Sequence, residues 1–433
     1  MKVVGLITEY NPFHNGHKYH IEEAKRITGA DYCVAVMSGN FVQRGIPAMI
    51  DKYERTEMAL RNGVDLIIEL PVCYATSSAE LFAHGAISIL DKLGIIDAIC
   101  FGSECGDIGL LREGAQFLLN PPTTYEKYLQ SYLKQGLTYP AARSKALRYY
   151  LKEQHSPYAD TLSQVLAEPN NILGIEYMKA LLRLNSNITP MTIQRISAHY
   201  HEEQLGVISE SLPADSRIPH VISSATAIRK AVQGVSELNN HLNNMQFSVP
   251  EDVFNKLKTA YQKLYPTCED DFLSHIQYKL LSETNQSLVI YSDITKDLAD
   301  RLNNRSNYYS SFSELANDIK TKNMTLTRIN RALIHILLNL KNEALNEYNA
   351  NGYAQYARVL GMKKSGSHLL RKIEKQNHIP IITKVSKAQS ILSPLAFQML
   401  QEDLFAAHLY NQIVYAKYSE EILNEYRHGI VII

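Results

Sequence analysis

The sequence predicts an α/β fold in which a parallel sheet, covered by helices on both faces, is followed by a mainly α-helical region. Three observations support this prediction. Apolar segments alternate regularly with helical segments over the first hundred residues, which is typical of a parallel sheet. The chain of 433 residues is too long for one ordinary core, so two or three domains are expected. From Glu251 onward the apolar spacing is mostly helical.

The first strand is expected over residues 3–7, where the chain reads "VVGLI". A helix should follow, because Ile21, Ala24 and Ile27 recur at helical spacing before Gly29, a residue type that commonly ends helices. The same alternation predicts strands over residues 31–39, 64–71 and 96–102, and helices over residues 51–63 and 78–94. Ligands bind such sheets outside the carboxyl ends of the strands, so "MSGN", "ELP" and "FGSE" mark the predicted ligand edge.

Beyond residue 105 helical patterns dominate, with one more strand expected in "MTIQRI" and a serine-capped helix in "SSATAIRKAV". Residues 234–250 are rich in asparagine and lack sustained periodicity. We therefore predict a domain boundary there, between an α/β domain over residues 1–235 and a helical, basic domain over residues 251–433.

Composition limits the class of protein. No apolar run is long enough to span a bilayer, and the N-terminus lacks the apolar core and cleavage site of a secretion signal. The five cysteines are widely scattered and include no C-x-x-C pair: Cys33, Cys73, Cys100, Cys105 and Cys268. These features predict a cytoplasmic protein with reduced cysteines and no membrane association. They predict no cysteine-based zinc site. No obligate protein partner is inferred from the sequence.

Charge is balanced overall but is unevenly distributed. Residues 301–433 hold 17 Lys and Arg against 10 Asp and Glu, so the first 300 residues carry an acidic excess. The bias is strongest over residues 358–387, with eight basic residues and one glutamate. A solvated helix face is one explanation, and an anionic partner, above all a nucleic acid, is the other. For the second explanation the candidate RNA-binding residues are Lys363, Lys364, Arg371 and Lys372.

Three histidines follow the first predicted strand in "EYNPFHNGHKYH", residues 9–20. Zinc binding is one interpretation of His14, His17 and His20, although helical ligand pairs usually stand four residues apart and no H-E-x-x-H motif is present. Ordinary surface or core histidines are another. A cluster at the ligand edge favours a third interpretation, which is phosphate handling.

Phosphate handling has a physical basis at this turn. A helix beginning near His17 would direct unpaired N–H groups and a partial positive charge toward an anion. Gly16 has no Cβ, so a phosphate could approach the backbone closely. The side chains of His14 and His17 could donate hydrogen bonds to the same oxyanion and stabilise charge in a transition state. Four further residues near the end of the second strand could neutralise pyrophosphate or RNA phosphate: Gln43, Arg44, Lys52 and Arg55.

The motifs resemble those of a known family. "HNGH" is similar to the H-x-G-H signature of nucleotidyltransferases, and "SSATAIR", residues 223–229, resembles their S-S-T-x-I-R type motif, with Ala225 where many relatives have Ser. Longer strings such as "MSGNFVQRGIPAMIDKYERTEMAL" and "EPNNILGIEYMKAL" look like the tRNA(Met) cytidine acetate ligase family. That resemblance covers residues 1–235 at least, and "YARVLG" and "IPIITK" extend it into the C-terminal part.

The resemblance implies a Rossmann-like nucleotidyltransferase domain followed by a helical domain. It implies that ATP activates acetate as acetyl-adenylate, and that the acetyl group passes to the wobble cytidine of elongator tRNA(Met). Magnesium would enter with the phosphates, and no dedicated metal site is predicted. His14 and His17 would be catalytic. The ATP-binding residues that the resemblance implies are Ile7, Thr8, Glu9, Tyr10, Asn11, Pro12, Phe13, His14, Asn15, Gly16, His17, Lys18, Tyr19, His20, Gly102, Asn170, Arg195, Thr226 and Arg229.

Some alternatives stay open at this point. Asn171 could contact the nucleotide in place of Asn170, and the acetate pocket cannot be assigned. An adenylyltransferase acting on a small phosphate ester is the closest rival function, and an RNA-binding protein with an inactive nucleotide fold is another. A P-loop ATPase is disfavoured, because "GMKKSG" is not followed by the Lys-Ser or Lys-Thr of a Walker A motif.

Overall fold

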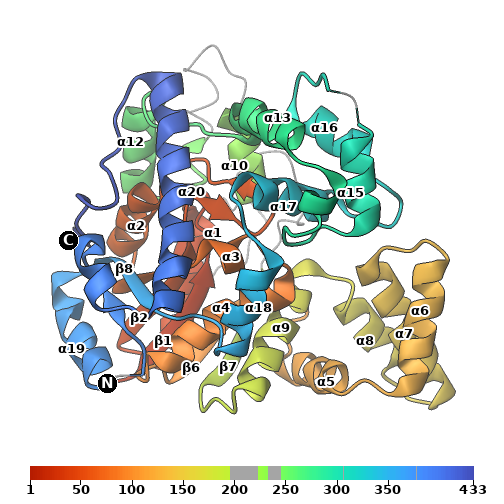
Figure 1. The fold of residues 1–433 in the computed structure, drawn as a ribbon. Coiled ribbons are helices and arrows are strands. Elements are labelled where there is room, and N and C mark those ends of the chain that lie inside the picture. The colour runs from red at the N-terminus through yellow and green to blue at the C-terminus, as the bar shows by residue number, and fades with distance from the viewer. Residues whose placement is uncertain (196–222, 233–244, 306, 377) are drawn as a thin grey trace.

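The computed structural model describes residues 1–195, 223–232, 245–305, 307–376 and 378–433 (Figure 1). Within these residues a mostly parallel sheet consists of β1 (Val3–Thr8), β2 (Tyr32–Ser38), β5 (Leu66–Leu70), β6 (Ala98–Ser103), β7 (Thr189–Gln194), β8 (Ala357–Met362), β9 (Ile381–Ile382) and β10 (Val431–Ile432). The strand order is β10-β8-β5-β2-β1-β6-β7, with β9 paired to β8. A small hairpin joins β3 (Phe41–Val42) to β4 (Ile46–Pro47).

Helices surround the sheet on both faces (Figure 1). In the described residues they are α1 (Asn15–Thr28), α2 (Lys52–Arg61), α3 (Val72–Ala75), α4 (Ala79–Lys92), α5 (Ile108–Leu119), α6 (Thr123–Lys134), α7 (Tyr139–Glu153), α8 (Ala159–Val165), α9 (Pro169–Arg183), α10 (Ala225–Val232), α12 (Glu251–Ala260), α13 (Leu273–Ser282), α14 (Asn285–Leu288), α15 (Lys296–Asn303), α16 (Phe312–Ile319), α17 (Leu326–Leu337), α18 (Asn342–Ala350), α19 (Ser367–Gln376) and α20 (Pro394–Tyr418). None of the helices described is both long and apolar enough to cross a membrane.

The four strands predicted from the N-terminal alternation are confirmed as β1, β2, β5 and β6, and the strand predicted in "MTIQRI" is confirmed as β7. All five pair in parallel. Successive side chains of a strand point to opposite faces of the sheet. In β2, Val34 and Val36 join one apolar core, whereas Cys33, Ala35 and Met37 join the other. Both faces of the central strands are therefore buried, which is why their sequences read as continuous apolar runs.

The predicted helix ends also have local causes. Gly29 ends α1 in the left-handed conformation with φ of 63°, which glycine adopts without a Cβ penalty. Asp51 precedes α2, and its carboxylate accepts hydrogen bonds from the backbone N–H groups of Tyr53 and Glu54. Ser78 caps α4 in the same way, through the N–H of Leu81.

The C-terminal region is mainly helical, as predicted, but it also completes the sheet. Strand β8 pairs antiparallel with β5, placing Ile67 opposite Gly361, and β10 then pairs in parallel with β8. The sequence predicts a parallel sheet, and the antiparallel strand β8 departs from that prediction. Strand β8 was not predicted, because its short apolar run stands among segments with helical spacing. The domain boundary between residues 235 and 251 stays a prediction, because residues 233–244 lie outside the described part of the chain. The segments on both sides of it contribute strands to the same sheet.

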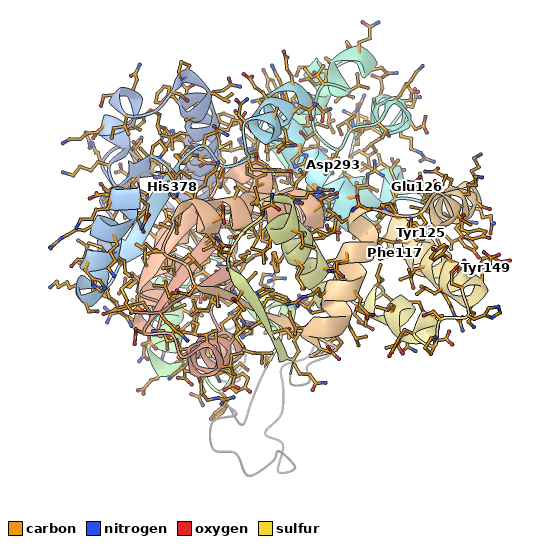
Figure 2. The ribbon with its side chains drawn as sticks, turned by 90° about the horizontal axis from the view of Figure 1, so that it is seen from below. Phe117, Tyr125, Glu126, Tyr149, Asp293 and His378 are labelled. Atoms are coloured by element: carbon orange, nitrogen blue, oxygen red, sulfur yellow. The ribbon has the colours of Figure 1, made fainter. Side chains whose placement is uncertain are left out.

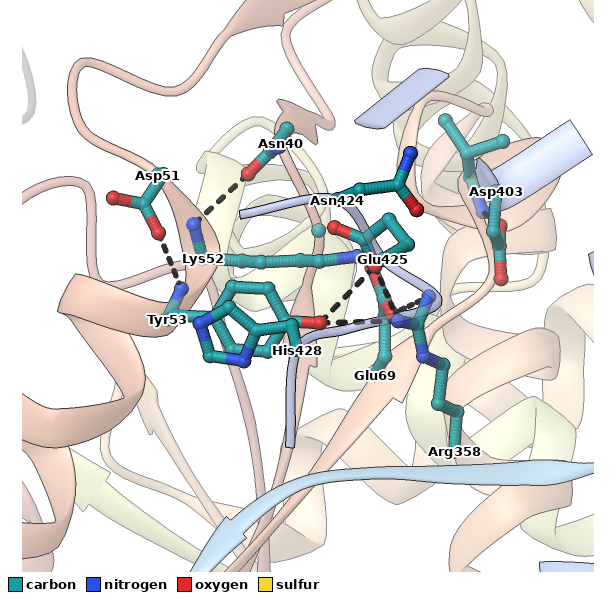
Figure 3. A network of polar contacts seen from close by, with 12 residues as sticks. Asn40, Asp51, Lys52, Tyr53, Glu69, Arg358, Asp403, Asn424, Glu425 and His428 are labelled. Atoms are coloured by element: carbon teal, nitrogen blue, oxygen red, sulfur yellow. Dashed lines mark hydrogen bonds and ion pairs between the residues drawn. The ribbon is translucent and has the colours of Figure 1, made fainter. Parts of the chain in front are cut away.

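A buried network of charges attaches the C-terminal segment to the sheet (Figure 3). The ammonium of Lys52 lies 2.7 Å from Oε1 of Glu69 and 3.0 Å from Oε2 of Glu425. Arg358 of β8 pairs with the same two carboxylates, at 3.1 Å from Glu69 and in direct contact with Glu425. The Tyr53 hydroxyl donates to Glu425 at 3.1 Å. Because two positive and two negative side chains lie together away from water, each one needs its partners to stay ionised.

We predict that Glu425→Gln strongly destabilises the protein. Removing this carboxylate leaves Lys52 and Arg358 with Glu69 alone, and breaking a buried ion pair typically costs about 3–5 kcal/mol. Denaturant unfolding of the full chain measures the loss. Glu421→Gln is the matched control, because Glu421 is exposed on the same segment. If both variants unfold at the same denaturant concentration as the unmodified chain, the network does not stabilise the fold.

Candidate functional site

The turn between β1 and α1 carries the histidine motif. His14 is the N-cap of α1, and its backbone N–H donates to Nδ1 of His17 at 3.2 Å. The helix therefore begins at Asn15, two residues earlier than expected, because this reciprocal cap stabilises the first turn. Since Nδ1 of His17 accepts a hydrogen bond, the proton of the neutral ring lies on Nε2.

The histidine rings form a compact group. The rings of His14 and His17 stack with centroids 3.6 Å apart, and Tyr10 meets the His17 ring edge-on at 4.9 Å. Burial lowers the pKa of His14 to about 3, with a further contribution from the positive charge of Arg195. Burial also lowers the pKa of His17, and the pKa of His20 to about 4. The three imidazoles are therefore neutral near pH 7, where they serve as N–H donors.

Positive charge at the site comes from arginines. Nη1 of Arg229 donates to the backbone oxygen of Asn11 at 2.7 Å, and its Nη2 donates to Oγ1 of Thr226 at 3.1 Å. Arg44 approaches the same hydroxyl at 3.5 Å. Helix α10 and the loop after β2 thus meet the histidine turn, although these segments lie far apart in the sequence. Guanidinium groups beside N–H donors suit a polyphosphate ligand.

The opposite wall comes from β6, β7 and α9. A Cβ on Gly102 would lie 3.3 Å from Cγ of Arg195, so glycine leaves room for the arginine stem beside the strand. Arg195 is placed by its backbone N–H, which donates to the oxygen of Ser103 at 2.9 Å. Its side chain is exposed at the ligand edge, next to the histidines whose pKa values it lowers.

Asn170 and Asn171 have different roles in the structure. Asn170 lines the cavity, and its Nδ2 donates to Oε1 of Glu104 at 2.6 Å. The other oxygen of Glu104 accepts the backbone N–H of Asn171 at 2.8 Å. Asn171 is buried, and its side-chain oxygen accepts the N–H of Cys105 at 3.1 Å. Glu104 therefore orients the Asn170 amide, leaving its oxygen available to a ligand.

These walls enclose a cavity of about 320 Å³. Of the ATP-binding residues that the resemblance implied, those lining it are Ile7, Thr8, Glu9, Tyr10, Asn11, His14, Gly16, His17, Tyr19, His20, Gly102, Asn170, Arg195, Thr226 and Arg229. Four others, Pro12, Phe13, Asn15 and Lys18, belong to the same turn but do not contribute to the lining. Among the described residues, no group of three or more His, Cys, Asp or Glu is arranged to hold a metal ion.

Sequence reasoning missed most of the apolar lining. Phe82 of α4 and Leu173 and Tyr177 of α9 form one wall, and the Tyr177 ring lies 5.5 Å from that of Phe101. No local signal distinguishes these residues from the core positions of their helices. The remaining lining residues that were not predicted as ATP ligands are Gln43, Arg44, Phe101, Ile193, Gln194, Ser223, Ser224 and Ala225. Gln43 and Arg44 had been proposed as phosphate-neutralising residues, and their position agrees with that hypothesis.

Lys52 and Arg55 do not fit the same hypothesis. Lys52 is 1 % exposed and belongs to the buried charge network. Arg55 is fully buried. Its guanidinium donates to the backbone oxygens of Glu9 at 2.6 Å, Ser38 at 3.0 Å and Ile50 at 3.0 Å, and it also contacts that of Gly39. Neither side chain can reach an external phosphate, so this part of the hypothesis is wrong.

The predicted RNA-binding cluster of Lys363, Lys364, Arg371 and Lys372 lies at the other end of the strands. The N–H of Lys363 donates to the oxygen of Asp65, the residue before β5, and Lys372 contacts Met1. These positions mark the amino ends of the parallel strands. The cavity lies at their carboxyl ends, so about 17 Å of strand separates the two.

Comparison with known proteins gives a consistent result. Residues 1–425 match the family model described as HIGH Nucleotidyl Transferase. The tRNA(Met) cytidine acetate ligase of Clostridium perfringens is 40% identical over 413 residues, which cover 95% of each chain. The protein of the same name from Acetivibrio thermocellus is 39% identical over 411 residues, covering 95% of this chain and 94% of its own.

A solved structure agrees over the whole length. The crystal structure of Thermotoga maritima TmcAL bound with alpha-thio ATP superposes with a TM-score of 0.87 at 31% identity, covering 100% of this chain and 99% of that one. Its apo form gives a TM-score of 0.88 at the same identity. Both the sequence relatives and the fold match nearly the entire chain, and the chain therefore belongs to the tRNA(Met) cytidine acetate ligase family of H-x-G-H nucleotidyltransferases.

Proposed function

We propose that this protein is an ATP-dependent ligase that activates acetate as acetyl-adenylate. It then transfers the acetyl group to N4 of the wobble cytidine of elongator tRNA(Met), giving N4-acetylcytidine. The observation that carries the proposal is the cavity at the ligand edge. There the stacked His14 and His17 stand beside Arg195 and Arg229, and an apolar wall closes the other side. Relatives named for this reaction share about 40% of the sequence.

ATP would lie along the β1–α1 turn, with its phosphates among the N–H donors and guanidinium groups. His17 donates from Nε2, while Thr226 and Arg229 reach the phosphates from α10. A phosphate at a helix N-terminus is further stabilised by the helix dipole. Asn170 would accept a hydrogen bond from the nucleoside through its side-chain oxygen, because Glu104 holds the amide in that orientation.

In the first step a carboxylate oxygen of acetate attacks the α-phosphorus of ATP. The bond from the α-phosphorus to the bridging oxygen breaks, and pyrophosphate leaves with the electron pair. His14 and His17 stabilise the negative charge that increases on the phosphoryl oxygens in the transition state. The site acts by positioning and electrostatic stabilisation, and no covalent enzyme intermediate is required. The methyl group of acetate would pack against Phe82, Leu173 and Tyr177.

In the second step N4 of the cytidine attacks the acetyl carbon. The bond from this carbon to the AMP oxygen breaks, AMP leaves, and N4 loses one proton. Activation is required because a free carboxylate is a poor acyl donor. A wobble base lies in a single-stranded loop, where it can leave the stack and enter a cavity.

Magnesium fits this site as a companion of the phosphates. Among the described lining residues Glu9 is the one carboxylate, and its Oε1 already accepts the N–H of Gln43 at 2.8 Å. Such a lining offers no carboxylate cage, so Mg²⁺ would be held mainly by phosphate oxygens and water. When bound there, it would neutralise phosphate charge.

The first prediction concerns the activation step. Acetate alone, without tRNA, should support isotope exchange between pyrophosphate and ATP in the presence of Mg²⁺. The reason is that adenylation uses only the cavity described above. Exchange is measured across a series of small carboxylates, with and without tRNA. A requirement for a phosphorylated small molecule would instead identify an adenylyltransferase.

A second prediction concerns the histidines. His14→Ala and His17→Ala should each slow acetate-dependent exchange by roughly 10²–10³-fold, because each removes a donor to the transition-state oxyanion. ATP affinity, measured by calorimetry, should change much less. His20→Ala serves as the comparison, since His20 lies one turn further along α1 and should matter less. Near-normal turnover of the His17 variant would show that its ring is not catalytic.

The third prediction separates the two asparagines. Glu104→Gln and Asn170→Ala should each raise the KM for ATP by roughly tenfold, the expected effect of losing one well-placed hydrogen bond. The kcat should change less, because neither residue faces the α-phosphorus in this proposal. Asn171→Ala is the control: it should lower the melting temperature and leave the KM near that of the unmodified enzyme. If instead Asn171→Ala raises the KM for ATP and Asn170→Ala leaves it unchanged, the nucleotide contact belongs to Asn171.

A further inference from the structure

Between β6 and α9 the chain inserts helices α5 to α8, whose role the cavity does not explain. Both connections of this insertion leave from the ligand edge, at Ser103 and at Pro169. Gly102 and Asn170, just outside its two ends, line the cavity, but no described residue from 104 to 168 does so. In Figure 1 the helices project from the body of the protein as a separate lobe.

Residues 121–158, which form α6, α7 and their flanking loops, are named the α6–α7 lobe. They carry six Lys and Arg and two Glu, although the first 300 residues as a whole are acidic. Seven of the 27 tyrosines of the chain also lie in these 38 residues. Basic residues interleaved with aromatic rings are typical of surfaces that bind single-stranded nucleic acid.

The charges and rings share the outer face of α7. The exposed side chains Lys145, Arg148, Tyr149 and Lys152 recur at helical spacing, and Tyr149 is 48% exposed. The ring of Tyr128 on α6 meets that of Tyr149 edge-on at 4.6 Å. This places an aromatic pair in the middle of a basic stripe.

A few acidic groups lie beside this stripe without cancelling it. Arg148 pairs with Asp160 at 2.6 Å and Lys152 with the same carboxylate at 3.5 Å, but these side chains are more than half exposed. Exposed pairs of this kind contribute little to stability, so a phosphate can replace the carboxylate. Glu153 accepts the Tyr128 hydroxyl at 2.7 Å. In the described structure no acidic side chain pairs with Lys145, which lies over the ring of Tyr132.

The lobe packs on α5 and has a fixed attachment to the site. Phe117 of α5 and Tyr125 of the lobe pack edge to face at 5.0 Å, and Figure 2 shows Tyr149 farther out on the lobe. On its inner side Arg143 pairs with Glu176 of α9 at 3.4 Å, and both side chains are buried. The next residue of α9 is Tyr177, which lines the cavity.

We infer that the α6–α7 lobe is an RNA-contacting surface, which binds phosphates through Lys145, Arg148 and Lys152 and stacks an unpaired base on Tyr149. The inference rests on the proposed tRNA-modifying function and names the surface that would hold the anticodon arm at the cavity. It differs from the expectation based on sequence, because the cluster of Lys363, Lys364, Arg371 and Lys372 lies at the far edge of the sheet.

The first test measures binding of unmodified elongator tRNA(Met) transcript to the full-length protein at several salt concentrations. The variant carries Lys145→Gln, Arg148→Gln and Lys152→Gln together. Losing three phosphate contacts should reduce the slope of log K against log salt by about two and weaken binding at least roughly tenfold at low salt. The matched control neutralises Lys363, Lys364, Arg371 and Lys372 and should bind nearly as the unmodified protein does.

The second test isolates the aromatic contact. Tyr149→Ala should weaken tRNA binding roughly 5- to 100-fold without changing the salt slope, because stacking carries no charge. Tyr149→Phe should retain binding, since the ring is kept. Acetate-dependent pyrophosphate exchange without tRNA should be unchanged in all lobe variants, which also confirms that they fold.

The outcomes distinguish this inference from the proposed function. If exchange fails in the unmodified enzyme, the proposed function is wrong, whatever the lobe binds. If exchange succeeds and the triple lobe variant binds tRNA with unchanged affinity and slope, the lobe is not an RNA surface. Loss of binding only in the control variant at Lys363, Lys364, Arg371 and Lys372 would place the RNA on that cluster. If the triple lobe variant binds tRNA normally but its mass in sedimentation changes, the outer face of α7 contacts another protein chain. That result would overturn the inference.

Discussion

The geometry of the ligand edge depends on the buried guanidinium of Arg55. Its N–H groups bind the backbone oxygens of Glu9, at the end of β1, and of Ser38 and Gly39, at the end of β2. Loop carbonyls in a protein interior need donors, and a cation satisfies several at once. The loop that carries the histidines is thereby fixed to the neighbouring strand. An arginine that sequence reasoning assigned to phosphate instead supports the wall of the cavity from behind.

The first turn of α2 connects this support to the C-terminal segment. Lys52 and Tyr53, three and two residues before Arg55, hold Glu425 by an ion pair and a hydrogen bond, and His428 stacks on the Tyr53 ring at 3.4 Å. One short helix therefore anchors both the β1–α1 loop and a segment more than 360 residues away in the sequence. Such an arrangement explains why the C-terminal region cannot be treated as a simple addition to a finished α/β domain.

The cavity itself divides into two environments. Around α1 and α10 it presents neutral imidazole donors and arginines, which suit phosphate oxygens. Around α4 and α9 it presents Phe82, Leu173 and Tyr177, which suit a small apolar group. Because burial keeps the imidazoles uncharged near pH 7, they can lie within stacking distance without repulsion. The combination supports a reaction that joins a small carboxylate to a nucleotide.

Local sequence determined the five parallel strands, the ends of α1, α2 and α4, and the chemistry at the β1–α1 turn. These features depend on apolar periodicity, capping residues and a motif that is contiguous in the chain, so neighbouring residues suffice to predict them. A contiguous motif also identified Thr226 and Arg229, but the local sequence could not predict how far these residues lie from His14.

Tertiary structure alone decided the rest. Whether Lys52 and Arg55 face solvent or the interior depends on Glu69, Glu425 and distant carbonyls, which no local pattern identifies. Which of Asn170 and Asn171 lines the cavity depends on Glu104, some 66 residues away. The antiparallel pairing of β8 sent α19 to the amino ends of the strands, because a strand that runs the other way delivers the next helix to the opposite edge. Periodicity specifies which face of an element is buried, and only long-range pairing specifies what lies against it.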